Sequence, residues 1–283
     1  METVLKSYQD QIEEAIRQNI LTFGEKTELY SACEYALLNG GKRFRPAIAL
    51  MVAKALGKSA DVLQAALAVE YFHTASLIAD DLPCMDNDDK RRGKASTHKV
   101  YGEATALLAS YSLIAAGYGL IADNSQKIAE SDLPFSANAG AIAILAIQNA
   151  SYNTGILGAS GGQYLDLFVQ DRVREAIEKK TASLFEISFV FGYLFGGGDI
   201  TKIDQIKQSS AYFGRAFQIA DDIDDMSQDL KNGSKANAAI IHGKEKALEL
   251  LQDELFSFFQ SIEVLGLNPK EFKELAKSLI LIE

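Results

Sequence analysis

Two acidic clusters constrain the fold of this chain more than any other feature. Both consist of aspartates: Asp80, Asp81 and Asp86 in the first cluster, and Asp221, Asp222 and Asp225 in the second. Each cluster ends a mostly apolar stretch with helical spacing, and residues i and i+4 of a helix share one face. Such close packing of like charges is unfavourable unless a cation lies between them. The pattern therefore predicts two acidic surfaces that face each other across a helical cavity.

Oxygen-rich clusters of this kind suit hard divalent cations. Mg²⁺ is usually held by one or two carboxylates together with the phosphates of a substrate, and Mn²⁺ also accepts oxygen ligands. The two clusters thus predict a site for a metal-bound diphosphate.

Helical periodicity runs through almost the whole chain, and no segment alternates apolar and polar residues convincingly enough to be a strand. The expected helices are Glu2–Ile20, Glu25–Leu38, a helix with Pro46 in its first turn that runs to Leu56, Asp61–Asp80, Gly102–Ala122, Ala137–Ser151, Gly162–Val169, Arg172–Phe195, Ile203–Leu230, Ala238–Ile262 and Lys270–Leu281. We expect the polar segment Leu82–Ser96 to be a loop. Because no linker separates domains, the sequence predicts one all-α domain over residues 1–283, a helical bundle around a central cavity.

Composition excludes several classes of protein. A net charge of −10 argues against a nucleic-acid binder, which needs a basic face. Two cysteines, Cys33 and Cys84, do not make a disulfide framework and favour a reducing compartment. Residues Met1 to Ile20 contain no apolar signal core, and no apolar run reaches the roughly 18 residues of a membrane span. We therefore expect a cytoplasmic protein without an integral membrane segment.

Three basic elements accompany the acidic clusters. They are Gly40–Pro46 with Lys42 and Arg45, the segment after the first acidic cluster with Arg91 and Arg92, and Lys179–Thr181. Arginine forms bidentate hydrogen bonds with phosphate oxygens, and the N-terminus of a helix attracts anions. Any one element alone is most often a solvated group of surface charges. Beside two acidic clusters, they favour binding of an anionic, phosphate-bearing substrate.

These elements resemble the trans-polyprenyl diphosphate synthase family, which includes farnesyl and geranylgeranyl diphosphate synthases. The matching segments, in the family's order, are Gly40-Gly41-Lys42-Arg43-Phe44-Arg45-Pro46, His73 to Asp81, the acidic loop to Arg91-Arg92-Gly93, Gly161-Gly162-Gln163, Lys180-Thr181 and Phe217 to Asp222. The resemblance covers about residues 37 to 235. It implies the isoprenoid synthase fold, a homodimer, and condensation of isopentenyl diphosphate with an allylic diphosphate.

The resemblance also implies a role for each matching residue. Three Mg²⁺ ions would bridge the allylic diphosphate to Asp80, Asp86 and Asp221, with Asp81, Asp222, Asp225 and Lys180 as further catalytic residues. The allylic diphosphate would be bound by Arg91, Lys180, Thr181, Gln218 and Lys235. Isopentenyl diphosphate would be bound by Lys42, Arg45, His73 and Arg92. No side-chain nucleophile is needed for this chemistry.

Product length depends on the helix that ends at Asp80. Farnesyl synthases of the bacterial type usually carry an aromatic residue five positions before the first aspartate, where this chain has Ala75. We expect the floor of the tunnel one turn further back, at Phe72 and Tyr71, because a turn of about 5.4 Å matches one isoprene unit. The predicted product is therefore geranylgeranyl diphosphate (C20). Core packing alone could also explain these three residues, with another helix setting the floor.

Several positions depart from the family's pattern. Ala79 replaces a frequent histidine, and Ser110-Tyr111 replaces a usual Gly-Asp, so that Tyr111 could narrow the cavity. The segment Met226 to Ala239 is short, and Ala236-Asn237-Ala238 replaces a usual Thr-Tyr-Pro. The alternatives are a farnesyl diphosphate synthase (C15), a regulatory subunit of a prenyl synthase, and a class I terpene cyclase. Two intact acidic clusters argue against the last two.

Overall fold

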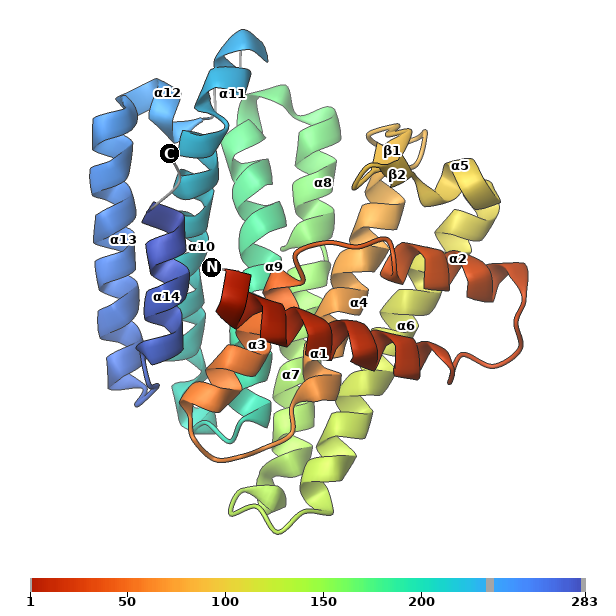
Figure 1. Cartoon of the computed structure of the whole chain (residues 1–283), viewed down its shortest axis with the longest axis vertical. Coiled ribbons are helices and arrows are strands. Elements are labelled where there is room, and N and C mark those ends of the chain that lie inside the picture. The colour runs from red at the N-terminus through yellow and green to blue at the C-terminus, as the bar shows by residue number, and fades with distance from the viewer. Residues whose placement is uncertain (1, 233–236, 281–283) are drawn as a thin grey trace.

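The protein is all-α, and its long helices lie side by side in a bundle (Figure 1). A computed structural model describes residues 2–232 and 237–280. The α-helices are α1 (Glu2–Ile20), α2 (Glu28–Leu37), α3 (Phe44–Ala55), α4 (Leu63–Asp80), α5 (Thr97–Tyr101), α6 (Glu103–Ala129), α7 (Ala139–Thr154), α8 (Ala159–Phe168), α9 (Val173–Phe195), α10 (Ile203–Asp224), α11 (Met226–Asn232), α12 (Ala238–His242), α13 (Lys244–Val264) and α14 (Lys270–Ile280). Three short 3₁₀ helices cover Ser136–Asn138, Gln170–Arg172 and Ile200–Lys202.

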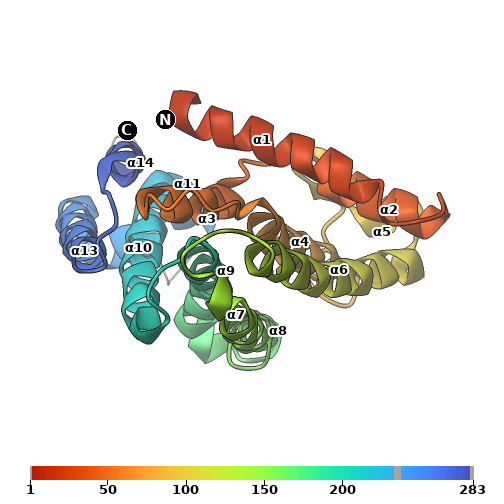
Figure 2. The same cartoon turned by 90° about the horizontal axis from the view of Figure 1, so that it is seen from below.

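Helix α9 lies at the centre of the bundle, in contact with α3, α4, α7, α8 and α10 (Figure 2). Its second half is almost entirely buried and apolar, from Leu184 to Phe195. Gly192 allows the close approach of α3, because a Cβ atom at this position would lie 2.3 Å from the carbonyl oxygen of Ala49. An apolar helix surrounded by others is typical of a bundle core.

Helix α1 lies across the bundle instead of along it (Figure 2). Ile12, Ile16 and Ile20 recur every four residues and are buried, so one stripe of α1 packs against the core. Helix α2 is capped by Thr27, whose hydroxyl accepts a hydrogen bond of 3.2 Å from the backbone N–H of Tyr30. These buried side chains belong to one continuous hydrophobic cluster that extends through the bundle.

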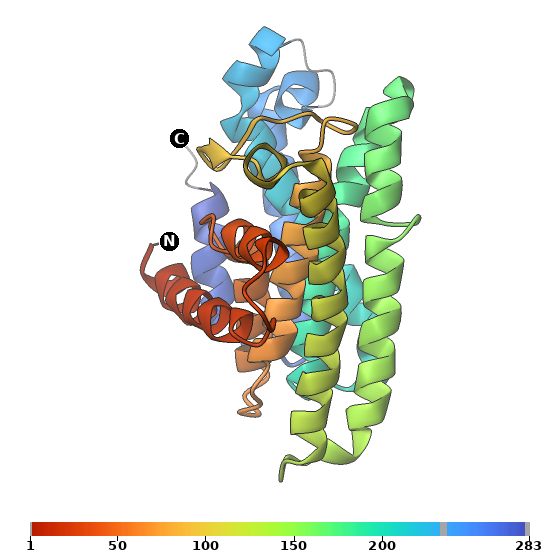
Figure 3. The same ribbon diagram turned by 90° about the vertical axis from the view of Figure 1, so that its right-hand side faces the viewer.

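Both acidic clusters lie at the same end of the bundle. The chain that follows α4 and the helix α11 that follows α10 both lie at the upper end in Figures 1 and 3. Helices α4 and α10 therefore carry aspartates at the same end of the bundle, at C-termini where the helix dipole is already negative. This arrangement concentrates negative charge at one end of the bundle.

The structure corrects several expected boundaries. The segment expected to be a loop contains a small antiparallel hairpin, β1 (Lys90–Arg91) and β2 (Lys94–Ala95), in which Arg91 pairs with Lys94. Strands of two residues are too short to show alternation of apolar and polar residues. Helix α5 was not predicted because its five residues are too few to show helical periodicity. The expected helix Ile203–Leu230 breaks after Asp224, and Ala238–Ile262 breaks at Gly243, where φ is +86°.

Of the described helices, α6 is long and apolar enough to cross a membrane, and 39% of its most apolar stretch is buried in the bundle. Length and composition alone do not separate a membrane span from a helix that packs in a core or an interface.

Candidate active site

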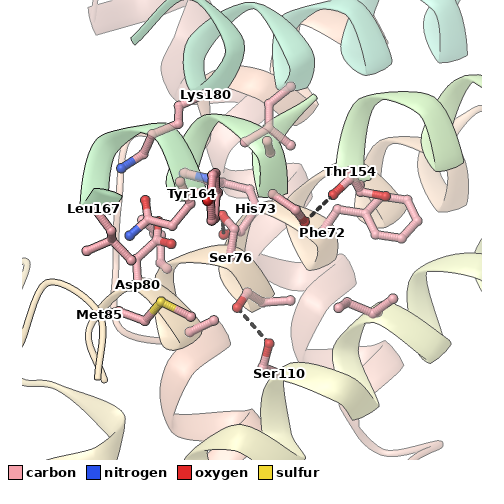
Figure 4. A pocket seen from close by; sticks show the side chains of 18 of the residues that line it. Phe72, His73, Ser76, Asp80, Met85, Ser110, Thr154, Tyr164, Leu167 and Lys180 are labelled. Atoms are coloured by element: carbon pink, nitrogen blue, oxygen red, sulfur yellow. Dashed lines mark hydrogen bonds between the residues drawn. The ribbon is translucent and has the colours of Figure 1, made fainter. Parts of the chain in front are cut away.

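A cavity of about 670 Å³ opens between α4, α6, α8 and α9. Figure 4 shows Asp80 and Lys180 at one end of this cavity and Phe72 at the other. Most of the lining is apolar, with contributions from Phe72, Ala75, Leu77, Ala79, Cys84, Met85, Ile114, Ala159, Tyr164, Leu167, Phe168 and Leu184. The cavity thus combines a charged end with a long apolar body.

The two aspartates that end α4 point in different directions. Asp80 lines the cavity, whereas Asp81 is 2% exposed and accepts hydrogen bonds from the Arg91 guanidinium, with Nε at 2.8 Å. Arg91 also pairs with Asp88 at 2.8 Å. Asp81 therefore ties the β-hairpin to the end of α4, and Asp80 is left to the cavity.

Burial raises the pKa of Asp80 to about 6, and the charge of Asp86 acts in the same direction, whereas Lys180 opposes it. Asp86 is held near Asp80, because its backbone N–H donates to the Asp80 carbonyl oxygen at 2.9 Å. The Asp86 carboxylate accepts a hydrogen bond of 2.8 Å from the amide of Gln163. Gln163 belongs to a matching motif, but the sequence alone did not indicate that it orients Asp86.

The second cluster repeats this division. Burial, and then the charge of Asp225, raise the pKa of Asp221 to about 6, while Lys42 and Arg45 lower it. The carboxylate of Asp222 accepts hydrogen bonds from the Gln218 amide at 3.0 Å and from the backbone N–H of Ala238 at 2.8 Å. The second aspartate of the pair is again engaged in the fold. Asp221 is half-buried, and unlike Asp80 it is not among the residues that line the cavity.

Lys180 and Thr181 lie on α9 beside the cavity, where the sequence placed them. Lys180 forms an ion pair of 2.8 Å with Asp166, and the Thr181 hydroxyl donates to Gln218 at 3.3 Å. The role of Asp166 was missed, although it follows the motif Gly161-Gly162-Gln163 by three residues. A signal was present in the sequence, since Gln163 and Asp166 are three residues apart on one helix face.

A second charged region, of opposite sign, adjoins the cavity at Arg45 and His73. The Arg45 guanidinium stacks on Phe185 at 5.1 Å, and its Nε atom has no hydrogen-bond partner among the described residues. Burial, followed by the charges of Arg45 and Arg92, lowers the pKa of His73 well below its usual value, so its imidazole is neutral at pH 7. The His73 Nδ1 atom is also buried and unpaired among the described residues. Such orphaned donors and acceptors beside several arginines suit an anionic ligand.

Three other basic residues near Arg45 differ in burial and in their partners. Lys42 is exposed and close enough to lower the pKa of Asp221. Arg43 is buried and forms ion pairs with Glu13 at 2.6 Å and with Glu70, so it belongs to the core. Arg92 donates to the carbonyl oxygen of Gly40 and packs on the turn before α3.

Gly41 makes the packing of Arg92 possible. A Cβ atom at Gly41 would lie 2.5 Å from Cζ of Arg92, and its φ of +120° also disfavours any other residue. The Gly-Gly turn and the Arg91-Arg92 hairpin are therefore interlocked, although they are far apart in sequence.

The residues expected to set product length divide into two groups. Ala75 and Phe72 line the cavity, as expected. Tyr71 does not: its hydroxyl donates to Asn19 of α1 at 2.6 Å, and its ring packs edge-on against Phe23. Successive helix residues are about 100° apart, which turns Tyr71 from the cavity toward α1. Tyr71 is therefore corrected to a core residue.

The expected effect of Ser110-Tyr111 is also corrected. Tyr111 is 58% exposed and is not among the cavity-lining residues, so it does not narrow the cavity. Ser110 does line the cavity, and its hydroxyl donates to the Ala75 carbonyl oxygen at 2.9 Å. This hydrogen bond joins α6 to α4. Lys235, the remaining predicted ligand of the diphosphate, lies outside the described residues.

The carboxylates fit Mg²⁺, although they do not form a complete cage. No three acidic, histidine or cysteine side chains converge on a common metal position in the described parts of the chain. Mg²⁺ is commonly held by one or two carboxylates plus phosphate oxygens. The raised pKa values of Asp80 and Asp221 show crowded, partly desolvated carboxylates that a cation would stabilise.

Comparison with known proteins decides the family. A family model described as polyprenyl synthetase matches residues 26–250. The chain belongs to this family. Its curated relatives include a chloroplastic geranylgeranyl pyrophosphate synthase of Capsicum annuum, 38% identical over 71% of this chain and 54% of the relative. A farnesyl diphosphate synthase of Geobacillus stearothermophilus is 36% identical over 80% of this chain and 75% of the relative.

Two solved structures share the fold. A geranyltransferase from Legionella pneumophila superimposes with a TM-score of 0.80, at 28% identity, over 99% of this chain and 96% of that chain. An FPP/GFPP synthase from Zymomonas mobilis gives a TM-score of 0.79 at 27% identity, over the full length of both chains. The chain spans about half to two thirds of the length of the first plant relatives that it matches.

Proposed function

We propose that this polyprenyl synthetase condenses isopentenyl diphosphate with an allylic diphosphate. The proposal rests on one observation above all. Asp80 ends α4 and Asp221 lies in the last turn of α10, at the same end of the bundle. Each is half-buried with its pKa raised to about 6, and Asp80 opens onto a long apolar cavity. A diphosphate with its cations would neutralise the carboxylates, and its prenyl chain would enter the apolar body.

The chemistry follows from this placement. The C1–O bond of the allylic substrate breaks, and the leaving diphosphate takes the electron pair. Mg²⁺, with Mn²⁺ as a substitute, would supply positive charge at that diphosphate through Asp80, Asp86 and Asp221. Lys180 and Arg91 would add donors there, with Thr181 and Gln218 beside them.

The second substrate would bind at the basic region. Arg45, His73 and Arg92, with Lys42 at the rim, would bind the diphosphate of isopentenyl diphosphate. Its double bond then forms the new C–C bond with the allylic carbon, and the released diphosphate accepts the proton that is lost from the neighbouring carbon. Neutral His73 would donate one hydrogen bond without adding charge.

The proposed product is geranylgeranyl diphosphate (C20). Ala75 is a small residue in the wall of the cavity, and Phe72 lies one turn deeper, edge-on to Tyr118 at 5.2 Å. The Phe72 ring sits against Gly117, where a Cβ atom would lie 2.8 Å from it. Relatives named for C20 and for farnesyl products both match the chain, so farnesyl diphosphate (C15) is the alternative.

Replacing Ala75 with Phe tests the position of the floor. The larger side chain should shorten the main product by about one isoprene unit, because one helical turn spans about 5.4 Å. Chromatography of the dephosphorylated products measures the change. An unaltered product profile in Ala75→Phe would place the floor elsewhere.

A product assay tests the activity itself. The protein would be incubated with Mg²⁺, labelled isopentenyl diphosphate and, in turn, dimethylallyl, geranyl and farnesyl diphosphate. A C20 product would support both the condensation activity and Phe72 as the floor of the cavity. A C15 product would support the activity and place the floor nearer to Asp80. Lack of condensation with every allylic substrate would favour a regulatory subunit instead.

We also propose that two copies of the chain associate through α6 and α7. These neighbouring helices expose large apolar side chains: Leu107, Leu108, Tyr111, Ile144 and Ile147. An exposed apolar surface of this kind is typical of an interface. Sedimentation equilibrium of the purified protein tests the proposal. The cytoplasmic location stays a prediction, since several relatives are named chloroplastic.

A further inference from the structure

Asn237 is a buried side chain at the point where the chain returns to the second acidic cluster. It is 2% exposed and precedes α12. Its carbonyl oxygen Oδ1 accepts a hydrogen bond of 3.0 Å from the backbone N–H of Ile240, which caps the helix. The sequence singled out this residue only as a departure from the family's pattern.

The amide nitrogen of Asn237 points toward the acidic cluster. It donates one hydrogen bond of 2.7 Å to the backbone carbonyl of Asp222 and another of 2.9 Å to the Asp229 carboxylate. The last carbonyls of a helix lack partners within the helix, and Asp222 lies in the last turn of α10. Asn237 thus satisfies an otherwise unpaired carbonyl and joins α10, α11 and α12.

A chain of hydrogen bonds continues from this point to the cavity. Ala238, the next residue, donates its N–H to one oxygen of the Asp222 carboxylate at 2.8 Å. The other oxygen accepts from Gln218 at 3.0 Å, and Gln218 in turn accepts from Thr181 at 3.3 Å. Asn237 is therefore connected to both proposed neutral contacts of the allylic diphosphate.

We propose that Asn237 is a positioning residue for the second acidic cluster. Its amide fixes the last turn of α10, and with it the direction of Asp221 and the orientation of Gln218. This inference rests on the proposed function. Only a side-chain amide offers two donors and an acceptor in one group, so serine, threonine or aspartate at this position cannot make all three bonds.

Asn237→Asp removes the two donated hydrogen bonds and keeps the accepted one. Aspartate has the same shape and retains the oxygen that caps α12, but it places a carboxylate against the Asp222 carbonyl and Asp229. We expect binding of Mn²⁺ in the presence of inorganic diphosphate, followed by electron paramagnetic resonance, to weaken about 10- to 100-fold. The Mg²⁺ concentration needed for half-maximal turnover should rise in parallel. The KM for isopentenyl diphosphate should change less than about threefold, because the proposed ligands of that substrate belong to α3 and the turn before it, to α4 and to the β-hairpin.

Two further variants separate positioning from folding. Adding Asp229→Asn to Asn237→Asp exchanges donor and acceptor across that pair, and should recover part of the Mn²⁺ affinity. Asn268→Asp is the matched control, because Asn268 caps the start of α14 through a 3.0 Å bond at the other end of the bundle (Figure 1). It should bind Mn²⁺ as the wild type does.

Mn²⁺ affinity of Asn237→Asp within twofold of the wild type would overturn the inference. A lower melting temperature with normal Mn²⁺ binding in the cold would also overturn it, because the role would then be one of stability alone. A wild-type protein that binds Mn²⁺ with diphosphate but forms no prenyl product would contradict the proposed condensation and leave the positioning role intact.

Discussion

Both acidic clusters bring like charges close together, but different partners bind the second aspartate of each cluster. In each cluster the first aspartate is half-buried with a raised pKa, and the second is bound within the fold. Asp81 is bound by a guanidinium, that of Arg91, whereas Asp222 is bound by neutral donors from Gln218 and Ala238. The first cluster therefore carries a built-in cation. In the second cluster, neutral hydrogen bonds hold Asp222 in place, and bound ligands would supply the positive charge that balances its carboxylates.

The largest expected effect comes from the first aspartate of either cluster. Asp80→Ala or Asp221→Ala should lower turnover by about 10³-fold or more, because each removes a carboxylate that would hold charge at the leaving diphosphate. Steady-state condensation assays measure the loss. Circular dichroism should show unchanged helix content in both variants.

The surface residue Asp89 provides the control for these activity measurements. It pairs with Lys99 at 2.7 Å, and both side chains are largely exposed. Asp89→Asn should retain turnover close to that of the wild type. Wild-type turnover in Asp80→Ala or Asp221→Ala would exclude the proposed metal ligands.

Asparagine at the second aspartates should affect stability and distinguish the two clusters. Asp81→Asn should lower the free energy of unfolding by about 2 kcal/mol, since it removes charge-assisted bonds and leaves the Arg91 guanidinium without its buried partner. Burial raises the pKa of Asp81 and so offsets only part of this loss. Asp222→Asn should cost about 1 kcal/mol, because its partners are neutral. Urea unfolding measures both, with Asp89→Asn expected within about 0.5 kcal/mol of the wild type. Equal losses for the two variants would remove the distinction between the clusters.

The smallest expected effect is a gain of stability and not a loss. In metal-free protein at pH 7.5, Asp80→Asn should raise the free energy of unfolding by about 1 kcal/mol, a value reduced for partial exposure. The pKa of Asp80 is about 6 in the fold against a usual 3.8, so the folded state binds this proton more tightly. The wild type therefore gains stability as the pH falls through about 6 toward about 4.

The advantage of Asp80→Asn should consequently shrink below pH 6 and be lost near pH 4. Thermal unfolding in the presence of a chelator, followed at several pH values, checks this dependence. Asp221→Asn should behave in the same way, since burial also raises its pKa to about 6. A destabilised Asp80→Asn protein at pH 7.5 would show that the ionised carboxylate is well solvated in the fold.

Much of the fold could be predicted because helix formation leaves a local pattern in the sequence. Apolar spacing, Pro46 near the start of α3 and the glycines after α2 predicted the all-α fold, which is confirmed. The breaks after Asp224 and at Gly243 were missed, because the helical pattern continues on both sides of each break. The hairpin at Arg91 was missed because it is too short to produce periodicity.

For the candidate site, too, residue identity was predictable from the sequence, whereas the direction of each side chain was not. The residue types and their order predicted the family, which is confirmed. Among the assigned residues, the cavity lining includes Arg45, Phe72, His73, Ala75, Asp80, Lys180 and Thr181. The sequence could not distinguish Asp80 from Asp81, or Tyr71 from Phe72, because neighbours on a helix differ only in the direction they face. It also gave no sign that Gln163 orients Asp86, or that Arg43 pairs with Glu70 in the core.

The sequence by itself determined which chemical groups this protein carries and that helices present them, because both depend on residue identity and short-range spacing. Only the tertiary structure decided which aspartate of each pair is bound within the fold, and that Asp80 opens onto the cavity. That choice depends on partners such as Arg91 and Ala238. Hydrogen bonds and desolvation act between segments that chain folding brings together, and local sequence spacing carries no record of those distances.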